Sequence, residues 1–85
     1  MTRTIHSAGQ TALIEALISA RRAAGLSQSA MAERLRCHQS MIARIESGER
    51  RIDVVELVIL ARATGTSAAA ILATVEPEVP LEQRI

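Results

Sequence analysis

Residues 25–65 decide the fold, and they read GLSQSAMAERLRCHQSMIARIESGERRIDVVELVILARATG. Gly25, Gly48 and Gly65 each follow a stretch with apolar residues at helical spacing, and each is followed within a few residues by Ser or Asp. Glycine adopts the left-handed conformation that ends a helix, and a Ser or Asp side chain accepts hydrogen bonds from the free N–H groups that start the next one. The pattern therefore predicts a run of short helices separated by tight turns.

Apolar residues three and four apart mark the body of each predicted helix. The predicted helices cover about 11–24, 28–35, 39–47, 54–64 and 67–73. Asp53 precedes the fourth of these helices, and Glu56, three residues on, completes the spacing of a capping box. No stretch of the sequence alternates between apolar and polar residues as a half-buried strand does. The predicted fold class is therefore all-α, with five short helices.

The predicted domain organisation has three parts. An N-terminal arm, residues 1–10, precedes the helical domain, residues 11–75. Two prolines and three acids break the helical pattern in residues 76–85, which predicts an extended tail. Within the domain, only residues 36–38 separate the second helix from the third, and a turn that short sets the two at a steep angle, as in a helix-turn-helix.

Composition limits the classes of protein to which the chain can belong. Apolar residues make up 48% of it and none is aromatic, so the core is expected to consist of Leu, Ile, Val, Met and Ala side chains. A single cysteine permits no internal disulfide, which fits a reducing cytosol. No apolar run is long enough for a secretion signal or a membrane span. We therefore expect a cytoplasmic protein without a membrane partner.

The net charge is only +1, but the charges are unevenly distributed. Residues 1–51 hold eight Arg and four Glu, a balance of +4, whereas residues 52–85 hold two Arg and five acids, a balance of −3. All ten basic residues are Arg, whose planar guanidinium matches phosphate oxygens and guanine edges. A genome with Arg-favouring codons explains the absence of Lys equally well. The net charge by itself argues weakly against a polyanion partner, whereas the positive balance of residues 1–51 favours one.

The quoted segment and its flanks, from about Leu13 to Leu72, resemble the Cro/repressor-type (XRE-like) helix-turn-helix family. The motifs that carry the resemblance are GLSQ at 25–28, the small Ala32, the run Ile42-x-x-Ile45-Glu46-x-Gly48 and the run Leu60-Ala61-x-Ala63-x-Gly65. The resemblance implies a lambda-repressor-like DNA-binding domain of a bacterial or phage protein that associates with the nucleoid. It also implies sequence-specific binding of double-stranded DNA as a transcriptional regulator, most often a repressor, without enzymatic activity or a cofactor.

Four positions depart from the family pattern. Arg36 stands where Gly is usual, Cys37 where an aliphatic residue plugs the core, His38 where Ser or Thr caps the third helix, and Thr64 where Leu is commoner. If Arg36 adopts the left-handed conformation, its side chain is expected to cost on the order of 1 kcal/mol. These changes make the turn less ideal but leave the helical pattern intact.

The resemblance implies that the third helix enters the major groove of DNA with its N-terminus first. The outward residues that are expected to read bases there are His38, Gln39, Ser40, Ala43 and Arg44. Gln39 and Arg44 are the principal candidates, because Gln can bind adenine, and Arg can bind guanine, through two hydrogen bonds. Each such pair favours its base over a wrong base by roughly 1–3 kcal/mol. The alternative is that these residues are only the solvated face of an amphipathic helix.

A second set of residues is expected to hold the DNA backbone. Gln28 begins the second helix, where its side chain and free backbone N–H groups can hold a phosphate oxygen. Arg50 and Arg51 follow the third helix as a second phosphate clamp, and Arg36 and Arg3 are further candidates.

Arg21 and Glu46 occupy positions that form an ion pair in similar proteins. The resemblance implies that this pair ties the first helix to the third. Its role is expected to be orientation more than net stability, because partly buried ion pairs often break even.

The fourth predicted helix is apolar on two sides, one expected to face the core and one left over. The second side and the tail supply the candidate dimer interface, namely Val55, Val58, Ile59, Val79 and Leu81. Because a helix that is apolar nearly all round is buried on both sides, we expect a two-fold homodimer whose recognition helices lie about 34 Å apart and read a palindromic operator. The alternative is a monomer in which the tail folds back over this side.

Catalysis and metal binding are not expected. Cys37 and His38 are adjacent in the sequence, so their side chains diverge, and two His with one Cys make a poor zinc set. Two other functions stay open. One is the antitoxin of a toxin–antitoxin pair, whose acidic, Pro-containing tail binds a basic toxin, and the other is a protein-interaction module that has lost DNA binding.

Overall fold

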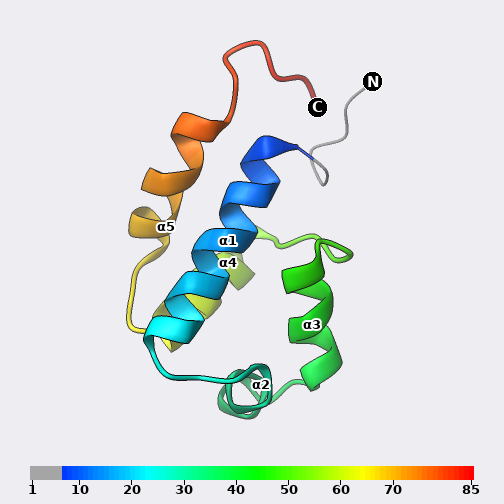
Figure 1. Ribbon diagram of the computed structural model, residues 1–85, viewed down its shortest axis with the longest axis vertical. Coiled ribbons are helices and arrows are strands. Elements are labelled where there is room, and N and C mark those ends of the chain that lie inside the picture. The colour runs from blue at the N-terminus through cyan, green and yellow to red at the C-terminus, as the bar shows by residue number, and fades with distance from the viewer. Residues whose placement is uncertain (1–6) are drawn as a thin grey trace.

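The computed structural model describes residues 7–85, which form five α-helices and a short 3-10 helix (Figure 1). In chain order the elements are α1 (Ala8–Ala23), α2 (Gln28–Leu35), α3 (Gln39–Ser47), α4 (Val54–Ala63), α5 (Ala68–Val75) and η2 (Glu76–Glu78). None of the described residues forms a strand, so the predicted all-α class is confirmed. The predicted bounds of the second and third helices are confirmed at both ends.

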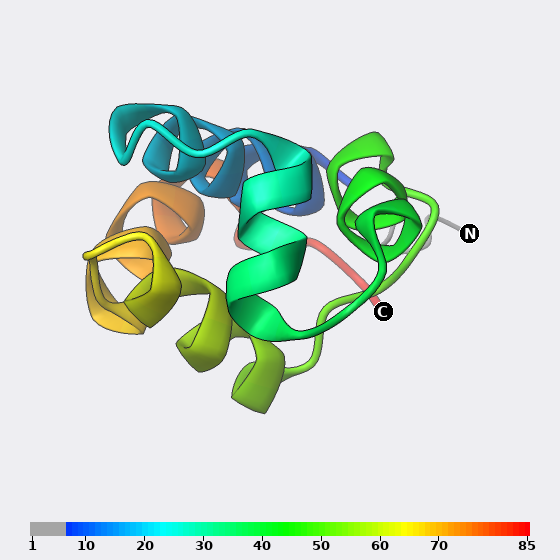
Figure 2. The same cartoon turned by 90° about the horizontal axis from the view of Figure 1, so that it is seen from below.

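Helix α1 lies at the centre of the domain and contacts α3, α4 and α5. In Figure 1, α5 and α3 lie on opposite sides of α1, with α4 behind it. Helix α2 is seen end-on there while α3 runs along the page, so the two helices cross steeply; from below, α2 lies between α3 and α4 (Figure 2). This arrangement leaves α3 at one edge of the domain.

Side-chain oxygens hold the N-termini of four helices. The capping residues, each of which accepts a hydrogen bond from the backbone N–H three residues on, are Ser7, Ser27, Asp53 and Ser67. Asp53 and Glu56 form the full capping box, in which the Asp53 N–H donates to Glu56 Oε1 over 3.0 Å. The exception is α3, because its N-cap residue, His38, makes no side-chain cap hydrogen bond.

Four helices end in the same Schellman turn, in which a backbone N–H donates to the carbonyl five residues earlier. These bonds run from Leu26 to Arg21, Cys37 to Ala32, Glu49 to Arg44 and Thr66 to Ala61. The left-handed residue is glycine in three of the turns, but at the end of α2 it is Arg36, with φ 56° and ψ 46°. An L side chain in this region costs roughly 1–2 kcal/mol, so the turn between α2 and α3 is strained.

We expect Arg36→Gly to raise the melting temperature (Tm), because glycine adopts the left-handed conformation without a side-chain clash. The greater freedom of glycine in the unfolded chain offsets part of the gain, which leaves about 0.5–1 kcal/mol, or about 2–8 °C for a domain of this size. Melting followed by circular dichroism measures Tm. Arg36→Ala is the control, since it removes the same charge but keeps the Cβ. A Tm for the Gly variant no higher than that of the Ala variant would contradict the strain.

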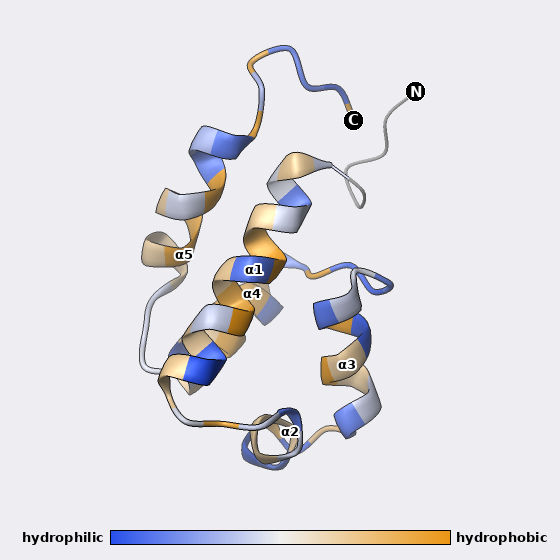
Figure 3. Cartoon of the chain, in the orientation of Figure 1, coloured by the Kyte–Doolittle hydropathy of each residue, from blue (hydrophilic) through white to orange (hydrophobic). Residues whose placement is uncertain are grey.

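Small aliphatic side chains from all five α-helices meet in one core: Leu17, Met31, Ala32, Ile42, Ile45, Leu57, Leu60, Ala61 and Ile71. Ala61 has no exposed surface, so α4 lies close to its neighbours along this side. Figure 3 shows the same division, with apolar residues along the middle of α1 and hydrophilic ones in the loop after α3. The core thus fixes the inner side of α3 and leaves its outer side to solvent.

The predicted start of the first helix and the predicted extended start of the tail are wrong. Helix α1 begins at Ala8, inside the predicted arm, because Ser7 caps it before the first apolar residue of the pattern. The tail is not extended from its first residue, because η2 directly follows α5. Val79 then packs against α1, where a Cβ added to Gly9 would lie 2.7 Å from Val79 Cγ2. The start of the tail therefore contacts α1, and Val55 and Ile59 of α4 stay exposed.

Candidate nucleic-acid interface

The outer side of α3 carries the residues predicted to read bases. His38, Gln39, Ser40 and Arg44 are exposed, and Ala43 is half-buried. The inner side of the same helix is apolar and buried in the core. The polar side chains are therefore neither packed inside the protein nor covered by another helix of residues 7–85, and they begin at the N-terminal end of α3.

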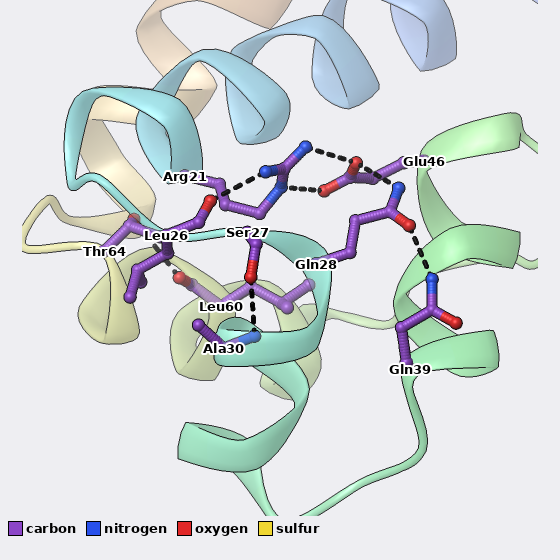
Figure 4. Close-up of polar contacts among 9 residues, drawn as sticks. All are labelled: Arg21, Leu26, Ser27, Gln28, Ala30, Gln39, Glu46, Leu60 and Thr64. Carbon is purple, nitrogen blue, oxygen red and sulfur yellow. Dashed lines mark hydrogen bonds and ion pairs between the residues drawn. The ribbon is translucent and has the colours of Figure 1, made fainter.

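An ion pair between Arg21 of α1 and Glu46 of α3 sets the position of this helix (Figure 4). The Arg21 Nε donates to Glu46 Oε2 over 2.7 Å, and Nη2 donates to Oε1 over 2.9 Å. The third nitrogen, Nη1, donates to the Leu26 carbonyl over 2.7 Å. The side chains of Arg21 and Glu46 are only 9% and 10% exposed. The ion pair implied by the family resemblance is thus present, as a two-bond contact shielded from solvent.

The environment keeps both partners charged. Burial by itself raises the pKa of Glu46, but the hydrogen bonds from Arg21 and Gln28, together with the charges of Arg21 and Arg22, bring it below its ordinary value of 4.5. The hydrogen bond to Glu46 raises the pKa of Arg21, although burial opposes the rise. At neutral pH the carboxylate of Glu46 is therefore ionised and can only accept hydrogen bonds.

Gln28, a predicted phosphate ligand, is already hydrogen-bonded within the protein. Its Nε2 donates to Glu46 Oε1 over 2.9 Å, and its Oε1 accepts from Gln39 Nε2 over 2.7 Å (Figure 4). These two bonds join the start of α2 to both ends of α3. Sequence reasoning missed the contacts, because they depend on how α2 crosses α3.

Arg50, the second predicted phosphate clamp, is bound to Glu56 of the capping box. Its Nη1 donates to Glu56 Oε1 over 3.1 Å, and its Nη2 donates to Oε2 over 2.7 Å. The hydrogen bond from Arg50 is the main reason why the pKa of Glu56 lies below its ordinary value. Arg50 thus holds the loop after α3 onto the start of α4. Its side chain is still 37% exposed, so it has surface left for a phosphate.

Arg36 and Arg51, the other candidate phosphate ligands among the described residues, are exposed. Arg36 lies in the turn before α3 and Arg51 in the loop after it, so the two flank the helix. Arg3, also a predicted phosphate ligand, lies outside the described residues.

The predicted dimer interface is only partly exposed. Val55 and Ile59 are 68% and 48% exposed, whereas Val58 is half-buried. Val54 was not predicted, although it is 77% exposed beside them. We call Val54, Val55 and Ile59 the apolar face of α4. In the tail, Leu81 is exposed, whereas part of the Val79 side chain is covered by its contact with α1.

A cluster of metal-ligating side chains and a single membrane-spanning helix are both absent from residues 7–85. This part of the chain holds no group of three or more His, Cys, Asp or Glu side chains that could bind a metal ion. It contains no single helix that is long and apolar enough to cross a membrane; α4 and the stretch from α5 through η2 reach that length only as a pair bent by 111°.

The steep α2–α3 pair, the short turn between them and the polar outer side of α3 define a domain of the helix-turn-helix class. The profile of the helix-turn-helix family matches residues 17–71. A solved structure, the XRE-family like protein from Pseudomonas syringae pv. tomato str. DC3000, is similar with a TM-score of 0.80 and 42% identity over 91% of this chain and 94% of that chain. No curated protein matches. The chain belongs to the XRE family of helix-turn-helix proteins, which are DNA-binding regulators.

The low pKa of Glu46 predicts how stability depends on pH. Because the folded-state pKa lies below the ordinary value of 4.5, the ion pair stabilises the fold above that pH, and this contribution is lost as pH falls through the folded-state pKa. Glu46→Gln is expected to lower the free energy of unfolding by about 3–5 kcal/mol at neutral pH, since Arg21 stays buried without its partner. As the pH falls into the acid range, the unfolding free energy of the Glu46→Gln variant should also change less than that of the wild type.

Urea unfolding across a pH series measures both effects. Glu49→Gln is the matched control, because Glu49 is an exposed carboxylate on the loop after the same helix and its loss should leave stability nearly unchanged. Equal stabilities of the Glu46→Gln and Glu49→Gln variants at neutral pH would show that the ion pair does not hold α3.

Proposed function

We propose that this chain is a sequence-specific transcriptional regulator, a repressor, that binds a palindromic operator as a homodimer. The observation that carries the proposal is the exposed polar side of α3, held at the edge of the domain by the buried Arg21–Glu46 ion pair. The proposed geometry places the N-terminal end of α3 in the major groove, which is wide enough for a helix.

Each outward residue of α3 has a proposed role. Arg44 binds guanine O6 and N7 through two N–H groups, and Gln39 binds adenine through its amide. Ser40 and His38 reach base edges or phosphates, and Ala43 contacts the base edge with its methyl group. The exposure of four of these five residues supports these roles.

Phosphate contacts are proposed for the residues that flank α3. Arg36 and Arg51 are exposed on either side of the helix, and Arg50 and Gln28 add contacts from groups that are already oriented by Glu56 and Glu46. Arg3 is a further proposed contact. Each phosphate neutralised releases counterions, so the logarithm of the affinity should fall with the logarithm of salt concentration by roughly 0.9 per contact.

The dimer is proposed to form through the apolar face of α4. Val54, Val55 and Ile59 all expose apolar surface on α4, and burying this surface against the same helix of a second copy removes it from water. Leu81 of the tail extends this surface in the proposed dimer. Two α3 helices about 34 Å apart would then meet successive major grooves.

Selection of bound duplexes from a random pool tests sequence-specific binding. The wild type is expected to enrich one palindromic sequence, and Arg44→Ala is expected to bind that duplex roughly 5- to 150-fold more weakly, because a two-bond contact to guanine is lost. Fluorescence anisotropy measures the affinities. Arg62→Ala removes an exposed Arg of α4 instead and should change affinity by less than about 2-fold. Binding that ignores sequence, or an Arg44→Ala variant that binds like the wild type, would count against the proposal.

The dimer has its own test. Val55→Glu places a charge in the proposed apolar contact and should shift the protein from dimer to monomer in analytical ultracentrifugation, with a loss of affinity for the palindrome of about 10-fold or more. Ser19→Glu, on the exposed side of α1, is the control. A wild type that sediments as a monomer on the palindrome would rule out this interface.

One observation favours a second function, that of an antitoxin which also binds its own promoter. The tail carries Glu76, Glu78 and Glu82 with the nearly fully exposed Leu81 and Ile85, a combination that suits a basic partner with an apolar groove. A neighbouring gene for a small basic protein that co-purifies with this chain would favour it.

If the family fold serves protein interaction alone, the affinity for duplex DNA will be weak and will lack the salt dependence of phosphate contacts.

A further inference from the structure

A cavity of about 200 Å³ lies between the end of α2, helix α3 and helix α4, which are seen together from below in Figure 2. Leu35 and Cys37 line it from the end of α2 and the turn that follows, and Met41, Ile42 and Ile45 line it from α3. Ile42 and Ile45 are buried residues of the core. The cavity therefore offers a bound molecule contacts with the core as well as with the surface.

The composition of the chain explains why the protein leaves this space between its helices. None of the 85 residues is aromatic, so no large ring is available to the core. Cys37 stands where related proteins usually have an aliphatic residue that plugs the core, and its side chain is smaller than that of Leu or Ile. A shorter side chain at a core position leaves a cavity unless its neighbours collapse onto it. A cavity beside Cys37 is what this departure from the family pattern is expected to leave.

Helix α4 contributes both apolar surface and an ion pair to the wall. Leu60 is buried whereas Ile59 is 48% exposed, so the cavity reaches the surface beside Ile59. Glu56 also lines the cavity, and its charge is balanced by the two-bond ion pair with Arg50. A charged molecule would lose its hydration here without gaining a partner of opposite charge, which costs free energy. The cavity therefore favours a neutral molecule.

The carboxylate of Glu56 can accept one further hydrogen bond. An ionised carboxylate has about four acceptor positions. Within residues 7–85, Oε1 accepts from Arg50 Nη1 and from the Asp53 N–H, and Oε2 accepts from Arg50 Nη2. This leaves a position on Oε2 for a hydroxyl or N–H donor, while the aliphatic side chains of the wall contact apolar atoms.

We propose that this cavity is a binding site for a small neutral molecule that is mostly apolar and has one hydrogen-bond donor, which meets Glu56 Oε2. An apolar cavity of about 150 Å³ holds benzene, so this one suits roughly six to eight non-hydrogen atoms. The buried wall residues Ile42 and Ile45 lie on the inner side of α3, away from the outward residues that are proposed to meet DNA. The site therefore goes beyond the proposed function and does not depend on it.

Phenol has the required size and a single donor, and it serves as the probe. It is titrated into the full chain labelled with ¹³C at the methyl groups of Ile, Leu, Val and Met, and methyl shifts are followed by NMR. The shifts are expected at Met41, Ile42, Ile45 and Ile59, with a dissociation constant of roughly 0.1–3 mM for a ligand of this size.

Two further probes test the chemistry of the site. Toluene has the size of phenol but no donor, and it leaves water more readily. Phenol should nevertheless bind at least as tightly as toluene, because its hydroxyl donates to Glu56. Benzoate carries a negative charge and should bind about 10-fold more weakly than phenol, or less tightly still. Tighter binding of toluene or of benzoate would contradict the proposed ligand class.

Two variants of Cys37 separate the volume of the cavity from the chemistry of the thiol. Cys37→Leu fills part of the cavity and should weaken phenol binding by about 10-fold or more. Cys37→Ala is the matched control, since it also removes the thiol but leaves the cavity open, and its affinity for phenol should stay within about 3-fold of the wild type. The Tm of each variant checks its fold. If Cys37→Leu does not fold, the methyl shifts of the wild type still show where phenol binds.

Three results would overturn the proposal. One is phenol shifts confined to Val54 and Val55, which are exposed outside the cavity, or no shifts at about 10 mM phenol. Another is equal binding by the wild type and a folded Cys37→Leu variant. The third is a set of intermolecular nuclear Overhauser effects between Ile42 and Val55 of a second copy, which would make the cavity part of the dimer contact. The experiment contains no DNA, so each of these results leaves the proposed regulator standing.

Discussion

The ion pair between Arg21 and Glu46 is the contact on which the arrangement of the domain depends. Two charges that are about nine-tenths buried gain little net stability, because the loss of hydration offsets their attraction. Their geometry is nevertheless restrictive, since the planar guanidinium meets the carboxylate through two bonds and the Leu26 carbonyl through a third. This places α1, the turn before α2 and the end of α3 in one fixed relation. Core packing alone, made of small aliphatic side chains, would allow α3 more freedom to slide.

The turn between α2 and α3 shows that a Schellman turn can form with a residue other than glycine in its left-handed position. Arg36 takes the left-handed position that glycine fills in the three other turns, yet the Schellman bond from Cys37 to Ala32 still forms. The strain is local, and the start of α3 is left without a side-chain cap because His38 makes none. Both departures lie at the exposed end of the helix-turn-helix and not in its core. The turn therefore departs from the ideal pattern without disturbing the packing of the helices on either side of it.

Most of the fold could be predicted from the sequence, because its signals are local. The bounds of α2 and α3 follow from Ser27, the short turn and Gly48, and the capping box of α4 follows from the spacing of Asp53 and Glu56. The start of α1 was missed because Ser7 stands outside the apolar pattern, and η2 because prolines suggest extension. The bonds of Gln28 and Arg50 could not be predicted, since they depend on which side chains the packed helices bring together.

The central claim is that the polar side of α3 lies in the major groove of a specific duplex. Intermolecular nuclear Overhauser effects, measured by NMR on the complex of labelled protein with its selected duplex, test this placement directly. The account predicts cross-peaks between side-chain protons of Gln39, Ser40 and Arg44 and major-groove protons such as thymine methyls and cytosine H5. Cross-peaks that come only from α1 and α5, with none from α3, would contradict it.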